Sequence, residues 1–314
     1  MVFSLGLCAL LLGSKLLVDE AIKICRRYQL SPFYIGSFLI GIGTSVPELC
    51  ISTVGVYYQS TDIAIGNVLG SYLGNLGLVL GTTAIIKPVL VSQNVIEKEI
   101  PLLLIALAFT VLLMVDGKLS SLDGWILLSL FFLFCTTSYF LNPQQQTNKL
   151  DEVKTPPPSL AQIIIHTAII ITSIAIIILG SYWMIQTAQV IAKKLEINDF
   201  LVGLTIIAIG TSLPELCTAI FCQVKQQNDL CLGNIIGSNI FCLLGILPIP
   251  AIFDPQSIAT EKLWPELISM IVITSIFWLF AAQFNTPKKI SRLEGSGLLT
   301  LYIIYIVMTC NLDG

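Results

Sequence analysis

Residues 43–50 read Gly-Thr-Ser-Val-Pro-Glu-Leu-Cys, and residues 210–217 repeat them as Gly-Thr-Ser-Leu-Pro-Glu-Leu-Cys. The repetition continues without a gap at an offset of 167 residues, so that Gly66-Asn67 matches Gly233-Asn234 and Gly70-Ser71 matches Gly237-Ser238. Both copies lie in long apolar stretches, where a glutamate is costly to bury. A repeated glutamate beside a helix-breaking proline therefore indicates a functional site.

The composition is that of an integral membrane protein. Hydrophobic residues make up 55% of the chain and charged residues 11%, whereas soluble domains carry about 25% charged residues. The formal charge of −3 and the lack of a basic tract give no indication of nucleic-acid binding, so we expect no nucleic-acid partner. A single histidine, His166, excludes a multi-histidine metal site, and nine cysteines without a CxxC pair give no support to zinc or thioredoxin chemistry.

The apolar segments predict an all-α fold of ten transmembrane helices, because one span needs about 20 mostly apolar residues. The expected spans are 3–26, 33–57, 62–86, 99–115, 121–141, 160–192, 200–224, 229–250, 262–284 and 292–310. A polar linker at 142–158 divides them, so we expect a first five-helix repeat over 1–141 and a second over 159–314. The repeated motifs of the two halves cover 36–81 and 203–247.

Five helices separate the two copies, and each crossing reverses the direction of the chain. The copies should therefore be inverted about a pseudo-two-fold axis in the membrane plane. With the N-terminus outside, 12 of the 16 basic residues fall in inner connections, and Lys118, Lys193, Lys194 and Lys262 fall in outer ones. This bias satisfies the positive-inside rule with both termini outside.

Thr44, Pro47 and Glu48 place polar groups at a break in the first copy. Pro47 has no N–H, so the carbonyl of Gly43 is left free and needs a hydroxyl, a water or a cation. Thr44 and Glu48 are four residues apart, so we expect them on one face of the helix. The second copy repeats the pattern with Thr211, Pro214 and Glu215.

The following helices add further oxygen donors, namely Ser71, Asn75 and Ser238. Carboxylates, hydroxyls, amides and carbonyls suit hard cations. Two glutamates supply a charge of −2, which balances one divalent cation or several monovalent ones, and a cation or a proton would relieve their repulsion. Glycines at close spacing would let these helices pack tightly: Gly66, Gly70, Gly74, Gly77, Gly233 and Gly237.

The two GTS(V/L)PEL blocks, each followed by a GN-x-x-GS block, resemble the two repeats of the cation/calcium exchanger superfamily, the sodium/calcium exchangers. The resemblance covers the whole chain and implies antiport of Na⁺ against Ca²⁺ by alternating access. It implies Glu48 and Glu215 as the principal metal ligands, with further ligands at Thr44, Ser45, Thr211, Ser212, Ser71, Asn75, Ser238 and the backbone carbonyls near Gly41 and Ala208.

Two residues depart from the family pattern. Cys242 stands where Asp or Asn is expected, and a thiol is a poor ligand for a hard cation. Tyr72 stands where Asn is expected. These changes leave open the coupling ion and the cargo, so alternatives are coupling to H⁺ or K⁺, transport of another divalent cation, and a transport-inactive relative.

A different class of function is an intramembrane enzyme that uses Glu48 and Glu215 as a carboxylate pair. No cofactor motif accompanies the pair, so we expect no enzyme activity and no cofactor, with Na⁺ and Ca²⁺ as transported substrates. The expected partner is the lipid bilayer, and no protein partner is implied. The resemblance and the size imply a prokaryotic type of exchanger, multi-pass in the plasma (inner) membrane.

Overall fold

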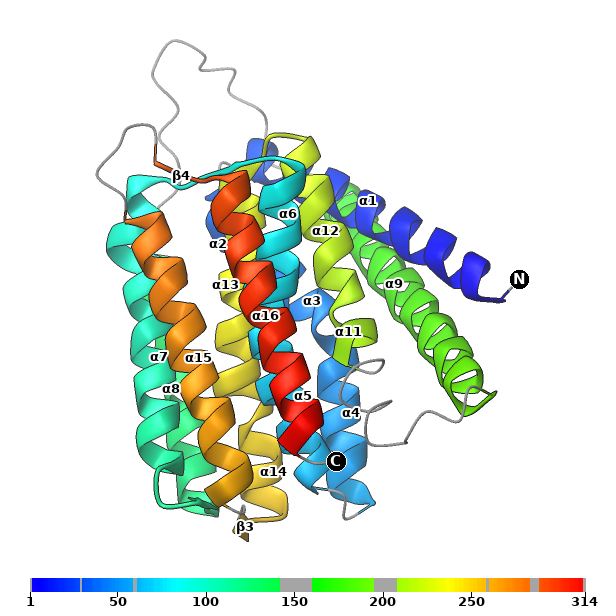
Figure 1. Cartoon of the computed structure of the whole chain (residues 1–314). Coiled ribbons are helices and arrows are strands. Elements are labelled where there is room, and N and C mark those ends of the chain that lie inside the picture. Colours follow the sequence, from blue (N-terminus) through cyan, green and yellow to red (C-terminus); the bar gives the residue numbers. More distant parts are fainter. Residues whose placement is uncertain are drawn as a thin grey trace.

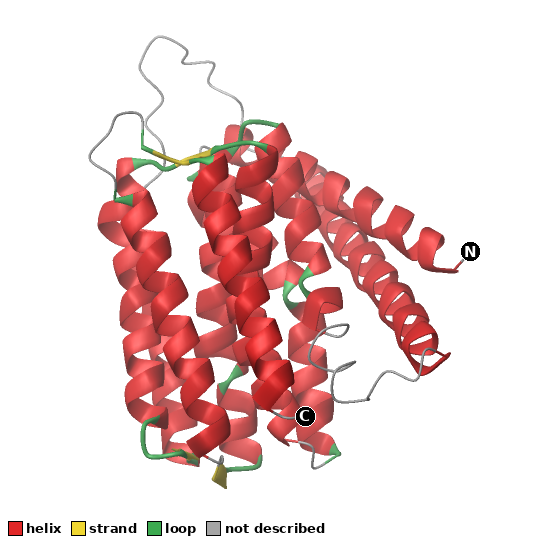
Figure 2. Cartoon of the chain, in the orientation of Figure 1, coloured by secondary structure: helices red, strands yellow, loops and turns green. Residues whose placement is uncertain are grey.

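The computed structural model describes residues 2–28, 30–58, 61–141, 160–194, 208–257, 260–282 and 288–312. The linker predicted at 142–158 and the start of the span predicted at 200–224 lie outside these ranges. The described residues are mostly helical, and the helices run side by side with loops at both ends of the bundle and interruptions within it (Figures 1 and 2).

The elements of the first half are the helices α1 (Val2–Tyr28), α2 (Pro32–Ile35), α3 (Ile42–Thr44), α4 (Val46–Tyr57), α5 (Thr61–Gly74), α6 (Gly81–Ile86), α7 (Ile100–Met114) and α8 (Ser121–Leu141), the π-helical segments η1 (Gly36–Gly41), η2 (Asn75–Leu80) and η3 (Val95–Glu99), and the strands β1 (Val89–Leu90) and β2 (Lys118–Leu119). Those of the second half are α9 (Leu160–Lys194), α11 (Ala208–Thr211), α12 (Leu213–Val224), α13 (Asn228–Phe241), α14 (Pro248–Phe253), α15 (Thr260–Ala281) and α16 (Arg292–Leu312), with η5 (Cys242–Ile246), β3 (Gln256–Ser257) and β4 (Lys289–Ile290).

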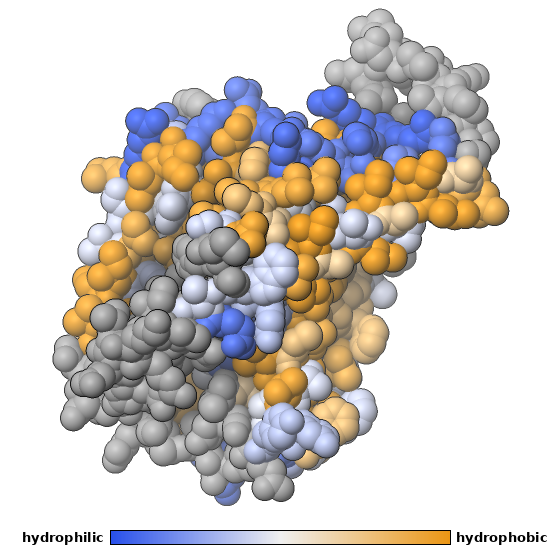
Figure 3. Space-filling model, turned by 90° about the vertical axis from the view of Figure 1, so that its right-hand side faces the viewer, coloured by the Kyte–Doolittle hydropathy of each residue, from blue (hydrophilic) through white to orange (hydrophobic). Residues whose placement is uncertain are grey.

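Five helical stretches of the described chain are long and apolar enough to cross a membrane. They are Ala64–Ile86, Ser121–Ser138, Leu160–Gly180, Asn228–Phe253 and Leu263–Ala281, and a bent pair, Pro32–Thr44 with Val46–Tyr57, makes a sixth if it is one span. The space-filling view agrees, since hydrophilic residues gather along the upper rim and the described surface below is mainly hydrophobic (Figure 3). The complete set of ten spans stays a prediction.

The sequence repeat recurs in the secondary structure. The bounds of α4, α5, α6 and β1 map onto those of α12, α13, α14 and β3 at the same offset of 167. The short strands pair across the halves, β1 with β4 and β2 with β3, both antiparallel. In Figure 1, β4 lies at the upper end of the bundle and β3 at the lower end.

Each copy of the motif breaks its helix at the serine before the proline. Ser45, with φ −85° and ψ 11°, separates α3 from α4, and the chain bends by 45° there. Ser212 separates α11 from α12 in the same way. Pro47 and Pro214 then fall in the first turn of α4 and α12, where a missing N–H costs no helical hydrogen bond.

Glycines bring α13 into backbone contact with the start of the first motif. A Cβ at Gly237 would lie 2.4 Å from Cα of Ser37, and one at Gly233 would lie 2.3 Å from the carbonyl oxygen of Phe33. The packing prediction is thus confirmed at these two positions, and also at Gly74 and Gly77, which face Ser212 and Tyr302. A Cβ built on Gly66 or Gly70 meets no described atom within 4 Å, so the packing prediction is not confirmed at these two positions.

Candidate metal centre

The two repeated glutamates lie in the first turns of two half-helices, α4 and α12. Glu48 is 1% exposed and Glu215 is fully buried. The N-terminus of a helix carries a partial positive charge, which stabilises a carboxylate at this position. A side chain of the first copy, Ser45, bonds Glu215 of the second, so the structure brings the two copies of the motif to one place.

The hydroxyl groups of each copy reach the glutamate of the other copy. Ser45 donates a hydrogen bond to Oε1 of Glu215 at 3.0 Å, and Thr211 is the hydrogen-bond partner of Glu48. The spacing of Thr44 and Glu48 predicted a shared face, but that geometry needs a continuous helix and the chain breaks at Ser45. The hydroxyl of Thr44 instead lies 3.3 Å from the carbonyl oxygen of Gly41 and 3.4 Å from Oδ1 of Asn234.

Two asparagines hold the glutamate helices in place, although the sequence argument gave them no role. The amide of Asn234 donates to the carbonyl of Glu215 at 3.4 Å and to the hydroxyl of Thr218 at 3.1 Å. The amide of Asn67 donates to the carbonyl of Glu48 at 3.3 Å. The sequence does contain a signal for them, because Asn67 and Asn234 match at the offset of 167 and each follows a repeated glycine.

The remaining candidate ligands are also buried around the motif. The side chains of Ser71, Asn75, Ser212 and Ser238 are at most 2% exposed. The hydroxyl of Ser238 donates to the carbonyl oxygen of Gly41 at 3.2 Å, and the N–H of Ser45 donates to the same oxygen at 3.1 Å. Ala208 is described only as the first residue of α11.

Several oxygen atoms of this cluster have no hydrogen-bond partner among the described residues. They are Oε2 of Glu48, Oε2 of Glu215, Oγ of Ser71, Oδ1 of Asn75 and Oγ of Ser212. Buried polar atoms are normally paired, so this many unpaired oxygens in one cluster is unusual. None of the ion pairs that the described residues form involves either glutamate. Two buried carboxylates with spare oxygens and no protein cation fit a hard metal ion.

Both residues that depart from the family pattern are fully buried, Cys242 at the start of η5 and Tyr72 in α5. The hydroxyl of Tyr72 lies 2.7 Å from that of Thr274, so Tyr72 has a partner on α15.

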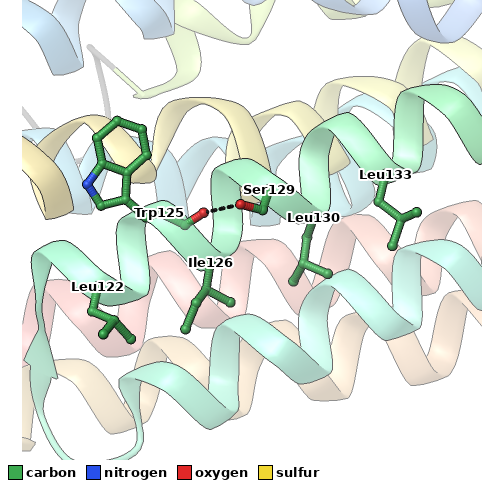
Figure 4. A pocket seen from close by; sticks show the side chains of 6 residues that line it. All are labelled: Leu122, Trp125, Ile126, Ser129, Leu130 and Leu133. Carbon is green, nitrogen blue, oxygen red and sulfur yellow. Dashed lines mark hydrogen bonds between the residues drawn. The ribbon is translucent and has the colours of Figure 1, made fainter.

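A surface pocket on α8 is of a different kind. It is lined by Leu122, Trp125, Ile126, Ser129, Leu130 and Leu133, and the hydroxyl of Ser129 already donates to the carbonyl of Trp125 at 2.7 Å (Figure 4). No charged side chain lines this groove, so it offers no carboxylate to a cation.

Comparisons with known proteins agree with this arrangement. The family model described as sodium/calcium exchanger protein matches residues 1–140 and 165–311. The chain is 34% identical over 309 residues to inner membrane protein YrbG of Escherichia coli (strain K12), covering 96% of this chain and 94% of that protein. It is 28% identical over 349 residues to sodium/calcium exchanger MaX1 of Methanosarcina acetivorans, covering 98% and 97%.

A solved structure gives the same result in three dimensions. The sodium-calcium exchanger NCX_Mj, soaked with 10 mM Na⁺ and zero Ca²⁺, superposes with a TM-score of 0.81 at 31% identity. The match covers 98% of this chain and 97% of that one. The overall helical arrangement is therefore that of a membrane cation exchanger.

Proposed function

The chain belongs to the sodium/calcium exchanger protein family, and we propose that it exchanges Na⁺ for Ca²⁺ across a membrane by alternating access. The observation that carries the proposal is the pair of buried carboxylates, Glu48 and Glu215, which no described lysine, arginine or histidine neutralises. A bare carboxylate at mid-membrane costs about 2.5–3.5 kcal/mol or more. An ion that binds between the two carboxylates removes that cost from both of them.

In this proposal the two glutamates are the charged ligands and the other oxygens complete the coordination. Ser71, Asn75 and Ser212 offer unpaired oxygens, while Ser45 and Thr211 hold the carboxylates in position. Thr44 and Ser238 each donate a hydrogen bond to the Gly41 carbonyl, and their hydroxyl oxygens keep lone pairs for an ion. Ala208 would contribute its backbone carbonyl. Such hydroxyl and carbonyl ligands suit Na⁺.

We propose the inverted ten-helix arrangement for the same protein, with repeats over 1–141 and 159–314 joined by the linker 142–158. The matched bounds of α4–α6 and α12–α14 support it, as do strand pairs at opposite ends of the bundle. An inverted repeat provides two related states of one scaffold, in which the shared site opens to one side or to the other.

The end of the bundle that holds β1 and β4 would face the cytoplasm. Lys87, Lys288, Lys289 and Arg292 lie in or next to these strands, and Lys118 lies in β2 at the opposite end. This asymmetry follows the positive-inside rule and supports the proposal that both termini lie outside. The plasma (inner) membrane of a prokaryote is the proposed location. The proposal involves no enzyme activity and no cofactor.

Flux measurements in liposomes test the exchange. Protein reconstituted into Na⁺-loaded liposomes should take up labelled Ca²⁺ when diluted into Na⁺-free buffer, and uptake should stop when Na⁺ is equal on both sides. Matched K⁺ and pH gradients serve as controls. Uptake that needs only the K⁺ gradient or only the pH gradient would show that K⁺ or H⁺, and not Na⁺, is the coupling ion. Absence of uptake in every gradient would contradict Ca²⁺ exchange altogether.

A further inference from the structure

We propose that Asn234 and Asn67 are matched positioning residues for the exchange cycle. Asn234 holds Thr44 in the state that the structure shows, and Asn67 holds Thr211 in the opposite state. The inference rests on the proposed function, because it takes the two repeats to exchange conformations during alternating access. It adds the hydrogen bonds by which the two states differ.

The first observation is a hydrogen bond that only one half makes. The hydroxyl of Thr44 donates to Oδ1 of Asn234 at 3.4 Å and so joins the first half to the second. At the offset of 167, the same bond would run from Thr211 to Oδ1 of Asn67. That oxygen is buried and has no hydrogen-bond partner among the described residues, so the equivalent bond is not made in this state.

A second bond between the halves shows the same asymmetry. Ser45 of the first half donates to Oε1 of Glu215 at 3.0 Å. Its counterpart Ser212 would donate to Glu48, but the buried hydroxyl of Ser212 has no described partner. The serine of the first copy is therefore engaged with the glutamate of the other half, and the serine of the second copy is not.

The third bond involves a main-chain carbonyl. Ser238 donates to the carbonyl oxygen of Gly41 at 3.2 Å. Its counterpart Ser71 would donate to the carbonyl oxygen of Ala208, yet the hydroxyl of Ser71 is buried without a described partner. Three bonds thus tie residues 41–45 to the second half, and the described residues make none of the three equivalent bonds.

The packing of the repeated glycines differs in the same sense. Gly233 and Gly237 on α13 are buried and meet the main chain of α2 and η1. Their counterparts on α5 are more open, since Gly66 is exposed and Gly70 is half-buried. This difference involves no hydrogen bond, so it is independent evidence. The first half docks on α13 more closely than any described residue docks on the matching face of α5.

Asn67 is nevertheless anchored in the same way as Asn234. The amide nitrogen of Asn67 donates to the carbonyl of Glu48 at 3.3 Å, and that of Asn234 donates to the carbonyl of Glu215 at 3.4 Å. Buried polar atoms are normally paired, so an anchored acceptor without a partner needs an explanation. An inverted repeat supplies one, because its two states exchange the roles of the halves. The bond that Asn234 accepts in one state is accepted by Asn67 in the other.

Hydrogen–deuterium exchange of the purified full-length protein, in detergent without Na⁺ or Ca²⁺, tests this assignment. The readout is the exchange rate of the amides in residues 33–41, which dock on α13 in the state described. Asn234→Ala favours the opposite state, and it should speed this exchange by about threefold to tenfold, as expected for the loss of one hydrogen bond. Asn67→Ala should not speed it, because the bond that it removes belongs to the opposite state.

A second pair of variants guards against a folding defect. Thr44→Val and Thr211→Val leave both asparagines in place, and they should act as Asn234→Ala and Asn67→Ala do. A purely structural role would speed the exchange of residues 33–41 in both asparagine variants alike, and that result would overturn the proposal. An unchanged rate in both Asn234→Ala and Thr44→Val would also overturn it.

Transport offers a separate readout of the same two states. In oriented proteoliposomes, the ratio of the apparent KM for Ca²⁺ at the two faces should shift in opposite directions in Asn234→Ala and Asn67→Ala. A shift in the same direction would contradict the assignment. Hydrogen exchange needs neither a gradient nor a bound ion, so a failure of Na⁺-driven Ca²⁺ uptake would overturn the proposed function and leave the exchange result standing.

Discussion

Glu48→Gln and Glu215→Gln should each abolish Na⁺-driven Ca²⁺ uptake while leaving the protein folded. Each change keeps the size of the side chain but halves the negative charge that faces the ion. Loss of one partner of a buried charge pair costs about 3–5 kcal/mol, which corresponds to roughly a hundredfold or greater loss of affinity for a divalent ion. Uptake of labelled Ca²⁺ into Na⁺-loaded liposomes measures the effect.

The matched control is Glu97→Gln, since Glu97 is exposed in η3 and bonds Gln93. It should exchange Ca²⁺ at the wild-type rate. All three variants should elute from size exclusion as the wild type does. Normal Ca²⁺ uptake by either Glu48→Gln or Glu215→Gln would rule out the proposed site.

The second large effect concerns the backbone contact between α13 and η1. Gly237→Ala places a methyl group 2.4 Å from Cα of Ser37 and 2.7 Å from its carbonyl oxygen, both of them main-chain atoms that cannot move alone. The two helices must separate, and the hydrogen bond from Ser238 to Gly41 is lost with them. Such overpacking costs about 1–3 kcal/mol.

We expect Gly237→Ala to lower the melting temperature in detergent by on the order of 5 °C. Gly297→Ala is the control, because a methyl group there meets only the ring of Phe280 at 3.9 Å. Gly297→Ala should have the same melting temperature as the wild type. Equal melting temperatures for Gly237→Ala and wild type would show that α13 and η1 do not pack as closely as described.

Much of the fold follows from the repeat. Because the offset is constant, the break before Pro47 predicts the break before Pro214, and the structure has both. The burial of Glu48 and Glu215 likewise follows from the apolar residues that surround each copy. The repeat alone does not predict how far apart the two copies lie in space. That distance depends on packing between helices far apart in the chain.

The details of the site depend on that packing. The bond from Ser45 to Glu215 joins residues 170 positions apart, and no local spacing predicts it. Asn234 donates a hydrogen bond to the carbonyl of Glu215 in its own half and accepts one from Thr44 of the other half. Its contacts can therefore be predicted only when the packing of the two halves is known. The π-helical turns that begin at Asn75 and Cys242 also leave no periodic signal in the sequence, although they begin at these two equivalent residues.

The central claim is that the two repeated glutamates share one cation, and diffraction from crystals soaked in Sr²⁺, as an anomalously scattering substitute for Ca²⁺, tests it most directly. We expect one strong anomalous peak between Glu48 and Glu215, at coordination distances of about 2.3–2.6 Å or slightly more. The peak should be absent from Glu215→Gln crystals. A protein that exchanges Ca²⁺ but shows no peak between these carboxylates, or binds the ion elsewhere, would contradict the account.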